Sequence, residues 1–323
     1  MAQAIRIHTY GGPEVLQWET VDVPTPGPTE VLLRHTAVGL NFIDIYERTG
    51  LYQVPLPTTP GREAAGVVEA LGSKVKQFAV GDRVAYVASS AGSYAQYRVM
   101  PVARLVRLPD MIEDHQAAAM MLKGLTAQAL LRQIHRVRRS DTVLIHAAAG
   151  GVGLIAVQWA KHLGATVIAV VGSESKAAIV REHQADHVLL TQDDWVAQVK
   201  SITRDRGVRV VYDSVGKDTF MASLDCLQPR GMMVTYGNAS GPVPPFTPLE
   251  LSKRGSLFLT RPTLFHYIAT QRDLQRAASE LFDLVQKNVL EIRVRQTYPL
   301  RDAAQAHEAL ESRKTTGSTV LVP

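Results

Sequence analysis

Short apolar runs, each closed by a turn, dominate the first third of the chain. The turns are rich in glycine and proline, as at Gly11-Gly12-Pro13 and Gly81-Asp82. Apolar runs between such turns predict strands. The expected strands are 5–9, 31–36, 65–71, 83–87 and 94–99. This pattern predicts a small barrel-like β domain, which gives way to helical character at 114–121.

Strands alternate with helices over residues 141 to about 262. The expected strands are 142–146, 165–171, 188–190, 208–212, 232–236 and 256–260, and the clearest helices are 154–162 and 174–182. Such alternation predicts an α/β fold with a doubly wound parallel sheet, the Rossmann arrangement.

The remaining chain returns to mixed structure. An amphipathic helix is expected at 273–287, followed by strand 295–298, helix 301–313 and strand 319–322. We expect this tail to rejoin the first domain, which is then discontinuous. The predicted domains are a β-rich domain of 1–124 and 265–323 and an α/β domain of 125–264.

A glycine turn lies between the first strand and first helix of the second domain. Residues 147–153 read Ala-Ala-Ala-Gly-Gly-Val-Gly, with Ala148 where the dinucleotide fingerprint usually has its first glycine. Glycines let the backbone approach a pyrophosphate, and a helix N-terminus offers free N–H donors. The strand–turn–helix context therefore predicts dinucleotide binding; the alternative is a plain packing turn.

The end of the second strand indicates which dinucleotide is bound. NAD-binding folds usually place an acid there for the ribose 2′-hydroxyl. Here the strand continues as Gly172-Ser173-Glu174-Ser175-Lys176, and Ser173 and Lys176 suit a 2′-phosphate. We therefore expect NADPH. Two alternatives stay open: Glu174 as a ribose ligand, and Ser173 as a simple helix cap.

Two later strands also end in turns with small and polar residues. Residues 236–241 read Tyr-Gly-Asn-Ala-Ser-Gly, and 213–216 read Asp-Ser-Val-Gly. Strand ends of a doubly wound sheet line the ligand crevice, so both turns are candidates for the nicotinamide half of the coenzyme. Each can equally be a tight turn.

Composition narrows the possible functions. The 323 residues are 46% hydrophobic with a net charge of +5, and Cys226 is the single cysteine. An intrachain disulfide and a zinc site of several thiolates are excluded. No apolar run is long enough to cross a membrane and no signal-peptide pattern is present, so we expect a cytoplasmic protein. Arg136, Arg138 and Arg139 form the densest basic group, which we interpret as a solvated helix end.

Several separated motifs resemble one protein family. They are Gly61-Arg62-Glu63-Ala64-Ala65-Gly66, Gly81-Asp82-Arg83-Val84, the glycine turn with Lys161-His162-Leu163-Gly164-Ala165, Asn41-Phe42-Ile43-Asp44-Ile45-Tyr46, Leu122-Lys123-Gly124-Leu125-Thr126 and Tyr212-Asp213-Ser214-Val215-Gly216. Together they resemble the medium-chain dehydrogenase/reductase superfamily, and more closely its quinone oxidoreductase branch, the NADPH:quinone reductases related to zeta-crystallin. The resemblance covers essentially the whole chain.

The resemblance implies a GroES-like catalytic domain, a Rossmann domain and a cleft between them, in homodimers joined through the strand at 256–260. Zinc-dependent members carry Gly-His-Glu where this chain has Gly61-Arg62-Glu63, and they use a cysteine ligand in the first domain, whereas this chain has no cysteine before Cys226. We therefore expect a metal-free enzyme. Close relatives often carry a tyrosine near Thr191, which stacks near the adenine; threonine cannot stack.

Without a metal, the enzyme must position reactants and stabilise developing negative charge, which suits quinones. The proposed catalytic residues are Asn41, Tyr46, Tyr52, Lys123 and Arg261. The proton can come from Tyr46, Tyr52 or water. The alternatives are that both tyrosines only pack, that Lys123 is solvated, and that Arg261 caps a strand end.

The resemblance also implies a set of coenzyme-binding residues. They are Phe42, Asp44, Tyr46, Ala149, Gly150, Gly151, Val152, Gly172, Ser173, Lys176, Ser214, Tyr236, Gly237, Asn238, Ser240, Gly241, Leu259, Arg261 and Arg313. Two other functions stay open: reduction of enones, 2-alkenals or enoyl thioesters, and a coenzyme-regulated RNA-binding or crystallin-like role. We see no basic platform interleaved with aromatic residues, so binding to nucleic acid is not expected.

Overall fold

The computed structural model describes residues 1–323, which form two compact units. The first unit contains 1–125, 268–287 and 292–323, and the second contains 126–267 and 288–291. The sequence analysis placed 288–291 with the rest of the tail. These residues belong to the second unit because the Glu291 backbone binds the Gln158 side chain, at 2.7 Å through its N–H and 3.2 Å through its carbonyl.

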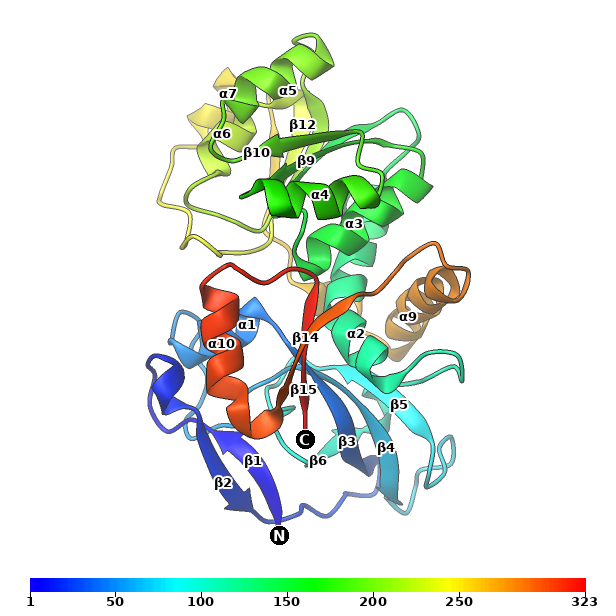
Figure 1. Cartoon of the computed structure of the whole chain (residues 1–323). Helices are drawn as coiled ribbons and strands as arrows, with labels where there is room; N and C mark the ends of the chain where they lie inside the picture. Colours follow the sequence, from blue (N-terminus) through cyan, green and yellow to red (C-terminus); the bar gives the residue numbers. More distant parts are fainter. The chain divides into compact units, whose positions relative to one another are not determined.

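A seven-stranded sheet organises the first unit. Its path is β14-β15-β3-β4-β5-β7, with β6 also paired to β3, and β1 and β2 form a separate hairpin-like pair (Figure 1). The strands of this unit are β1 (Ala2–Arg6), β2 (Gln17–Val21), β3 (Glu30–Leu40), β4 (Glu63–Leu71), β5 (Arg83–Val87), β6 (Tyr97–Pro101), β7 (Leu105–Arg107), β14 (Val294–Pro299) and β15 (Ser318–Val322). The C-terminal strand β15 pairs antiparallel with β3.

Helices pack against this sheet through apolar faces. They are α1 (Phe42–Arg48), α2 (Asp114–Gln128), α9 (Gln271–Gln286) and α10 (Ala303–Glu311). The α9 helix begins at the cap Thr270, whose hydroxyl accepts from Asp273 N–H at 3.1 Å. Its buried face includes Leu281, which lies against Gly124 of α2 so closely that a β-carbon there would meet the leucine methyls at 2.6 and 2.7 Å. Gly124 thus allows the two helices to approach.

The second unit contains a six-stranded parallel sheet. Its order is β10-β9-β8-β11-β12-β13, which is the doubly wound order and confirms the predicted Rossmann arrangement. Its elements are β8 (Thr142–His146), α3 (Gly151–His162), β9 (Thr166–Val171), α4 (Glu174–Glu182), β10 (His187–Leu190), α5 (Trp195–Thr203), β11 (Val208–Asp213), α6 (Phe220–Leu224), β12 (Leu227–Thr235), α7 (Leu249–Lys253), β13 (Phe258–Thr260) and α8 (Leu264–Tyr267). The chain enters it through a π-helical segment, Ala129–Ile134.

Each unit has its own apolar core. In the first unit, residues such as Leu33, Val68 and Leu105 are fully buried, and in the second, Ile168 and Val211 are too. Burying one such side chain contributes about 1.5–3 kcal/mol. The parallel strands read as continuous apolar runs because both of their faces are covered.

Seven strands and α-helices of the structure were not predicted from the sequence: β2, β7, α1, α5, α6, α7 and α8. The strand β2 has no buried residue and pairs only with β1, so it carries no alternating apolar signal. Several predicted strands also begin at other residues; the strand expected at 232–236, for example, is Leu227–Thr235. The expected strand 5–9 is Ala2–Arg6, and the expected strand 94–99 is Tyr97–Pro101. Such shifts arise where a strand end is set by its partner.

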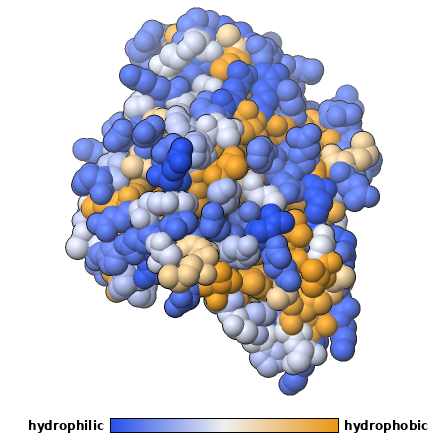
Figure 2. All heavy atoms as spheres, turned by 60° about the horizontal axis from the view of Figure 1, so that its bottom comes forward, coloured by the Kyte–Doolittle hydropathy of each residue, from blue (hydrophilic) through white to orange (hydrophobic).

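No helix is long and apolar enough to cross a membrane. On the face in Figure 2, hydrophobic side chains lie in several patches that hydrophilic ones interrupt.

Candidate active site and coenzyme site

Two predicted catalytic residues of the first unit meet on one carboxylate. Asn41 Nδ2 donates to Glu63 Oε1 at 2.7 Å, and Lys123 Nζ donates to the same oxygen at 2.9 Å. Glu63 Oε2 accepts from the Leu122 N–H at 2.6 Å. Asn41 and Lys123 are each 7% exposed and Glu63 is fully buried. The cluster is therefore a buried ion pair between Glu63 and Lys123, to which the Asn41 amide is hydrogen-bonded.

The local sequence explains why these residues meet. The strand β3 ends at Leu40, and Asn41 caps α1, with its N–H donating to Asp44 Oδ2 at 2.9 Å. Before the cap, Gly39 leaves room for the Glu63 carboxylate and the Ala118 carbonyl, which a β-carbon would meet at 2.3 and 2.2 Å. Glycine is thus required for the start of β4 and for α2 to lie against the end of β3, just before α1.

The predicted aromatic residues of the same segment form a contiguous group. The rings of Phe42 and Tyr46 lie 6.1 Å apart, and those of Tyr46 and Tyr52 lie 5.3 Å apart in an edge-to-face arrangement. The Tyr52 N–H donates to the Tyr46 carbonyl at 2.9 Å. Tyr46 is 8% exposed and Tyr52 is half-buried. Their roles in proton transfer and coenzyme binding stay predictions.

Behind α1 lies a buried polar chain. Arg48 donates to His307 Nδ1 at 3.1 Å, His307 Nε2 lies 3.0 Å from the Tyr94 hydroxyl, and that hydroxyl donates to Asp44 Oδ2 at 3.0 Å. A guanidinium can only donate, so His307 Nδ1 accepts and Nε2 carries the hydrogen. Burial together with Arg48 lowers the pKa of His307 to about 3, which is consistent with a neutral ring.

Asp44 is fully buried at the end of this chain. Burial, and then the neighbouring Glu47, raise the pKa of Asp44 to about 8. Its Oδ1 has no hydrogen-bond partner, and neither does Glu47 Oε2. Asp44 is thus a carboxyl group that holds its proton at neutral pH. The sequence analysis expected it to bind coenzyme, which stays a prediction.

Arg62 pairs with Glu47 at the position where the zinc-dependent proteins of the superfamily carry histidine. Both Nε, at 2.6 Å, and Nη2 donate to Glu47 Oε1. Burial raises the pKa of Glu47, although Arg62 opposes the shift. No group of three or more histidine, cysteine or acidic side chains could hold a metal ion. A guanidinium here repels any cation that would approach.

In the second unit, the glycine turn lies at the switch point of the sheet, between β8 and β11. Strand order reverses there, which opens a crevice for a dinucleotide. Gly150 caps α3, and the helix begins at Gly151. At Gly153 a β-carbon would meet the Ala147 carbonyl at 2.4 Å, so this glycine is required for helix–strand packing. At Gly150 the nearest atom to such a carbon is at 3.2 Å, so space remains for a ligand.

The second strand of this sheet ends beside the glycine turn. Ser173 caps α4, and its hydroxyl accepts from Lys176 N–H at 3.4 Å and contacts Ser175 Oγ at 2.9 Å. Capping is therefore the observed role of Ser173, and a phosphate contact stays a prediction. Glu174 pairs with Arg181 on the exposed face of α4. Around Gly172 only Thr191 Oγ1, at 3.9 Å, approaches the position of a β-carbon.

The turns after β11 and β12 pack against each other. Ala239 N–H donates to the Ser214 carbonyl at 3.2 Å, and a β-carbon on Gly237 would meet that carbonyl at 2.4 Å. Ser240 Oγ donates to the Val215 carbonyl at 2.9 Å, so its hydroxyl holds the turn. Arg261, after β13, donates to Gly237 O at 2.9 Å and Thr235 Oγ1 at 3.2 Å. Because β11, β12 and β13 are parallel, the turns that follow them all lie at the carboxyl end of the sheet.

The structure thus gathers most predicted residues into two groups, one in each unit. Asn41, Phe42, Asp44, Tyr46, Tyr52 and Lys123 form the first, and the residues from Ala149 to Arg261 form the second. Arg313 follows α10 in a left-handed conformation with φ of 57°. Sequence reasoning missed Glu63 and His307. Glu63 stood within a quoted motif, whereas His307 gave no local signal.

Comparisons with known proteins agree with the two folds described above. Residues 27–110 match the alcohol dehydrogenase GroES-like domain family, and 151–286 match the zinc-binding dehydrogenase family. A quinone oxidoreductase of Pseudomonas aeruginosa is 50% identical over 325 residues, with 100% of both chains covered. A 2-haloacrylate reductase of Burkholderia sp is 48% identical, covering 100% of this chain and 99% of that protein. The crystal structure of Escherichia coli quinone oxidoreductase complexed with NADPH has a TM-score of 0.98 at 47% identity, covering 100% of both chains. The chain therefore belongs to the quinone oxidoreductase branch of the medium-chain dehydrogenase/reductase superfamily.

Proposed function

We propose that this protein is an NADPH-dependent reductase that transfers hydride to quinones without a metal ion. The observation that carries the proposal is the full-length, 50% identity to a quinone oxidoreductase. The switch-point turn of the second unit, as a coenzyme site, and the Asn41–Glu63–Lys123 cluster of the first, as a source of donors, support the proposal.

The residues present fit NADPH. One atom alone approaches the position of a β-carbon at each of Gly150 and Gly172, the Ala147 carbonyl oxygen at 3.2 Å and Thr191 Oγ1 at 3.9 Å, and α3 directs its first N–H groups toward the turn. Ser173 and Lys176 would hold the 2′-phosphate. When bound, NADPH supplies a hydride from C4 of its nicotinamide ring. Arg261 would hold the nicotinamide end, because it already fixes the Gly237 turn.

The protein's own part in the reaction is positioning and charge stabilisation. Reduction of a quinone places negative charge on its oxygen, which a nearby cation and hydrogen-bond donors stabilise. Lys123 and Asn41 would contribute here, held by Glu63. Tyr46 or Tyr52, or a water molecule, would donate the proton.

A steady-state assay tests the proposal. Purified protein is mixed with 1,4-benzoquinone and either NADPH or NADH, with and without EDTA. We expect a kcat/KM for NADPH at least about tenfold above that for NADH, because a charge-assisted phosphate contact contributes about 1.5–3 kcal/mol. EDTA should leave the rate unchanged. Loss of activity with EDTA would contradict the metal-free proposal, and preference for NADH would contradict the coenzyme assignment.

A second candidate function is the reduction of activated alkenes. It is favoured by the 48% identity to a 2-haloacrylate reductase. The same donors would stabilise an enolate in place of a reduced quinone. Side-by-side turnover of 1,4-benzoquinone, a 2-alkenal and 2-chloroacrylate with NADPH separates the two candidates.

We also propose a homodimer joined through β13. This strand is the edge of its sheet and pairs only with β12, and Phe258 on it is 58% exposed. An apolar edge strand favours pairing with another chain. Light scattering of the purified protein should give the dimer mass, and Phe258→Glu should give a monomer. Met221→Glu is the control, because it adds the same charge at an apolar residue that is 38% exposed on α6 and not on β13.

A further inference from the structure

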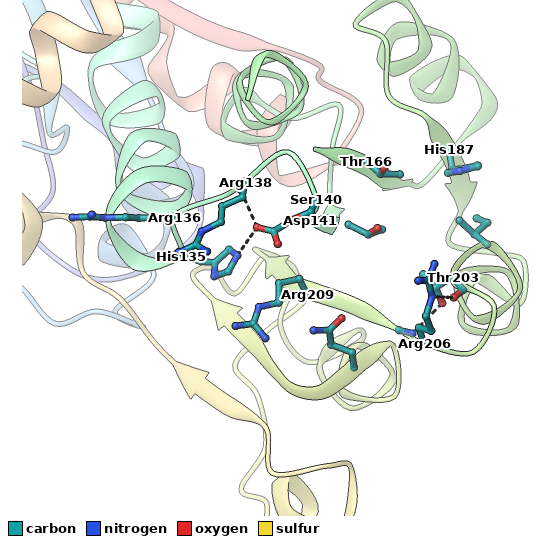
Figure 3. Close-up of a pocket in the computed structure, with 14 residues that line it drawn as sticks. His135, Arg136, Arg138, Ser140, Asp141, Thr166, His187, Thr203, Arg206 and Arg209 are labelled. Carbon is teal, nitrogen blue, oxygen red and sulfur yellow. Dashed lines mark hydrogen bonds and ion pairs between the residues drawn. The ribbon is translucent and has the colours of Figure 1, made fainter. Parts of the chain in front are cut away.

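A cavity of about 730 Å³ lies in the second unit, at the amino ends of its parallel strands. The coenzyme site is expected at the carboxyl ends of the same strands. Its walls come from the amino ends of β8, β9, β10, β11 and β12 and from the end of α5 (Figure 3). None of the predicted coenzyme residues lines it. This volume is typical of small-molecule sites and far exceeds that of one inorganic anion.

Positive charge dominates the lining. The lining contains four arginines, Arg136, Arg138, Arg206 and Arg209, and Asp141 is its single acidic residue. Asp141 Oδ2 already accepts from His135 Nε2 at 3.0 Å and from the Arg138 backbone N–H at 2.9 Å. The carboxylate therefore fixes the loop that carries His135 and Arg138.

The four arginines lack acidic partners. Arg206 Nε bonds only the Thr203 carbonyl, at 3.3 Å, and Arg209 Nη1 only the Arg230 carbonyl, at 3.4 Å. None of the four forms an ion pair, whereas arginines elsewhere in the chain, such as Arg83 and Arg254, do. An anion in the cavity would give these guanidiniums the counter-charge that the protein itself does not supply.

The arrangement of the arginines indicates the kind of anion. In Figure 3, Arg138 and Arg209 come from segments far apart in the sequence and lie on the same side of the cavity as His135, while Arg206 lies toward the other end beside Thr203. A ligand that contacts all of them must be elongated and carry more than one charge. Guanidiniums bind phosphates with two parallel hydrogen bonds.

We propose that this cavity binds a small anion with two or more phosphate groups, separately from the coenzyme. Arg138 and Arg209 hold one end and Arg206 the other. The sequence analysis interpreted Arg136, Arg138 and Arg139 together as a solvated helix end. The structure separates them, because Arg136 and Arg138 line the cavity and Arg139 does not.

Isothermal titration calorimetry of the full chain with inorganic tripolyphosphate tests this proposal. NADPH is kept at about ten times its Kd, and NaCl at 150 mM, so that the coenzyme site is filled and non-specific attraction is screened. We expect one tripolyphosphate per chain. The double variant Arg138→Gln/Arg209→Gln should bind at least about tenfold more weakly, the loss expected when charge-assisted hydrogen bonds are removed. Arg139→Gln should change Kd less than twofold.

Arg139→Gln is a matched control, since it removes the same charge from the next exposed position. Thermal unfolding midpoints check that all variants fold. A further titration with ADP distinguishes the source of the phosphates: tighter binding than tripolyphosphate indicates a nucleotide, and weaker binding a free polyphosphate. Absence of binding, binding abolished by NADPH, or an equal loss in Arg139→Gln would each overturn the proposal.

Discussion

Glu63 and Lys123 form an ion pair that is closed to solvent, with 2.9 Å between Oε1 and Nζ and side-chain exposures of 0% and 8%. The same carboxylate binds the Asn41 amide and the Leu122 backbone. Glu63 thus joins the start of β4, the cap of α1 and the middle of α2. Every donor around it depends on its negative charge.

We expect Glu63→Gln to lower the free energy of unfolding by about 3 kcal/mol or more, because it leaves the Lys123 ammonium buried without a counter-charge. Urea denaturation measures this change. Glu69→Gln is the matched control on the same strand. Glu69 pairs with Arg34 at the surface, where such pairs contribute less than about 1 kcal/mol.

A double variant separates charge from packing. Glu63→Gln combined with Lys123→Met removes both charges at similar volume, so it should recover part of the stability that Glu63→Gln loses. If Glu63→Gln and Glu69→Gln destabilise the protein equally, the buried pair has no special role.

The raised pKa of Asp44 predicts that the stability of the folded protein depends on pH. Its pKa in the folded protein is about 8, mainly because of burial, against 3.8 as the ordinary value. Between these values the folded protein holds a proton that the unfolded chain has lost. Stability therefore falls as pH rises from about 4 to 8 and levels off above 8. Asp44→Asn imitates the protonated form, so it should gain stability relative to the wild type as pH rises.

Neighbouring groups titrate as well, so the comparison must be a difference between proteins. Glu47 and Tyr94 lie beside Asp44. Neutral His307 has the opposite effect: it makes the folded protein less stable as pH falls below 6.5, where the unfolded chain binds a proton that the buried ring does not. Melting temperatures of Asp44→Asn and wild type at pH 5, 6.5 and 8.5 give this difference, with exposed Asp22→Asn as control. A difference that stays constant with pH would show that Asp44 is ionised throughout.

The parallel sheet could be predicted because its signal is local. Residues 142–146 and 165–171 are continuous apolar runs, and the turn between strand and helix requires glycine at 153 for contact with Ala147. The helix α1 could not be predicted in this way. It has only seven residues, and five of them are buried, including the charged Asp44, Glu47 and Arg48. Its stability comes from partners, not from helical periodicity.

The buried polar chain within the site also could not be predicted from the local sequence. Tyr94 reaches Asp44 across 50 residues and His307 across 213 residues of sequence. Local sequence marks Asn41 and Lys123 as donors, but it cannot indicate that both donate to Glu63. Long-range partners decide where each charge lies, and a single sequence does not reveal them.

Lys176 should determine the preference between the two coenzymes. We expect Lys176→Ala to lower kcat/KM for NADPH about tenfold and to leave that for NADH nearly unchanged, because only NADPH has a 2′-phosphate for the ammonium to bind. Lys200→Ala is the control, since Lys200 is exposed on the neighbouring helix α5. Equal losses with both coenzymes would show that Lys176 acts on the fold and not on the phosphate.

The two glycines of the switch-point turn should respond differently to alanine. At Gly153 the new methyl group would meet the Ala147 carbonyl at 2.4 Å and the Ala148 Cα at 2.7 Å, both of them backbone atoms that cannot move easily. Gly153→Ala should therefore destabilise the protein by about 1–3 kcal/mol. At Gly150 the backbone is extended, with φ of −79°, and the methyl group would meet only the Ala147 carbonyl oxygen, at 3.2 Å, which a shift of a few tenths of an ångström relieves. Gly150→Ala should keep the melting temperature within a few degrees but weaken NADPH binding at least about tenfold, because the methyl group occupies the volume that the pyrophosphate needs. Thermal unfolding and fluorescence titration with NADPH measure the two effects separately. If Gly150→Ala binds NADPH as tightly as the wild type, the pyrophosphate does not lie against this turn.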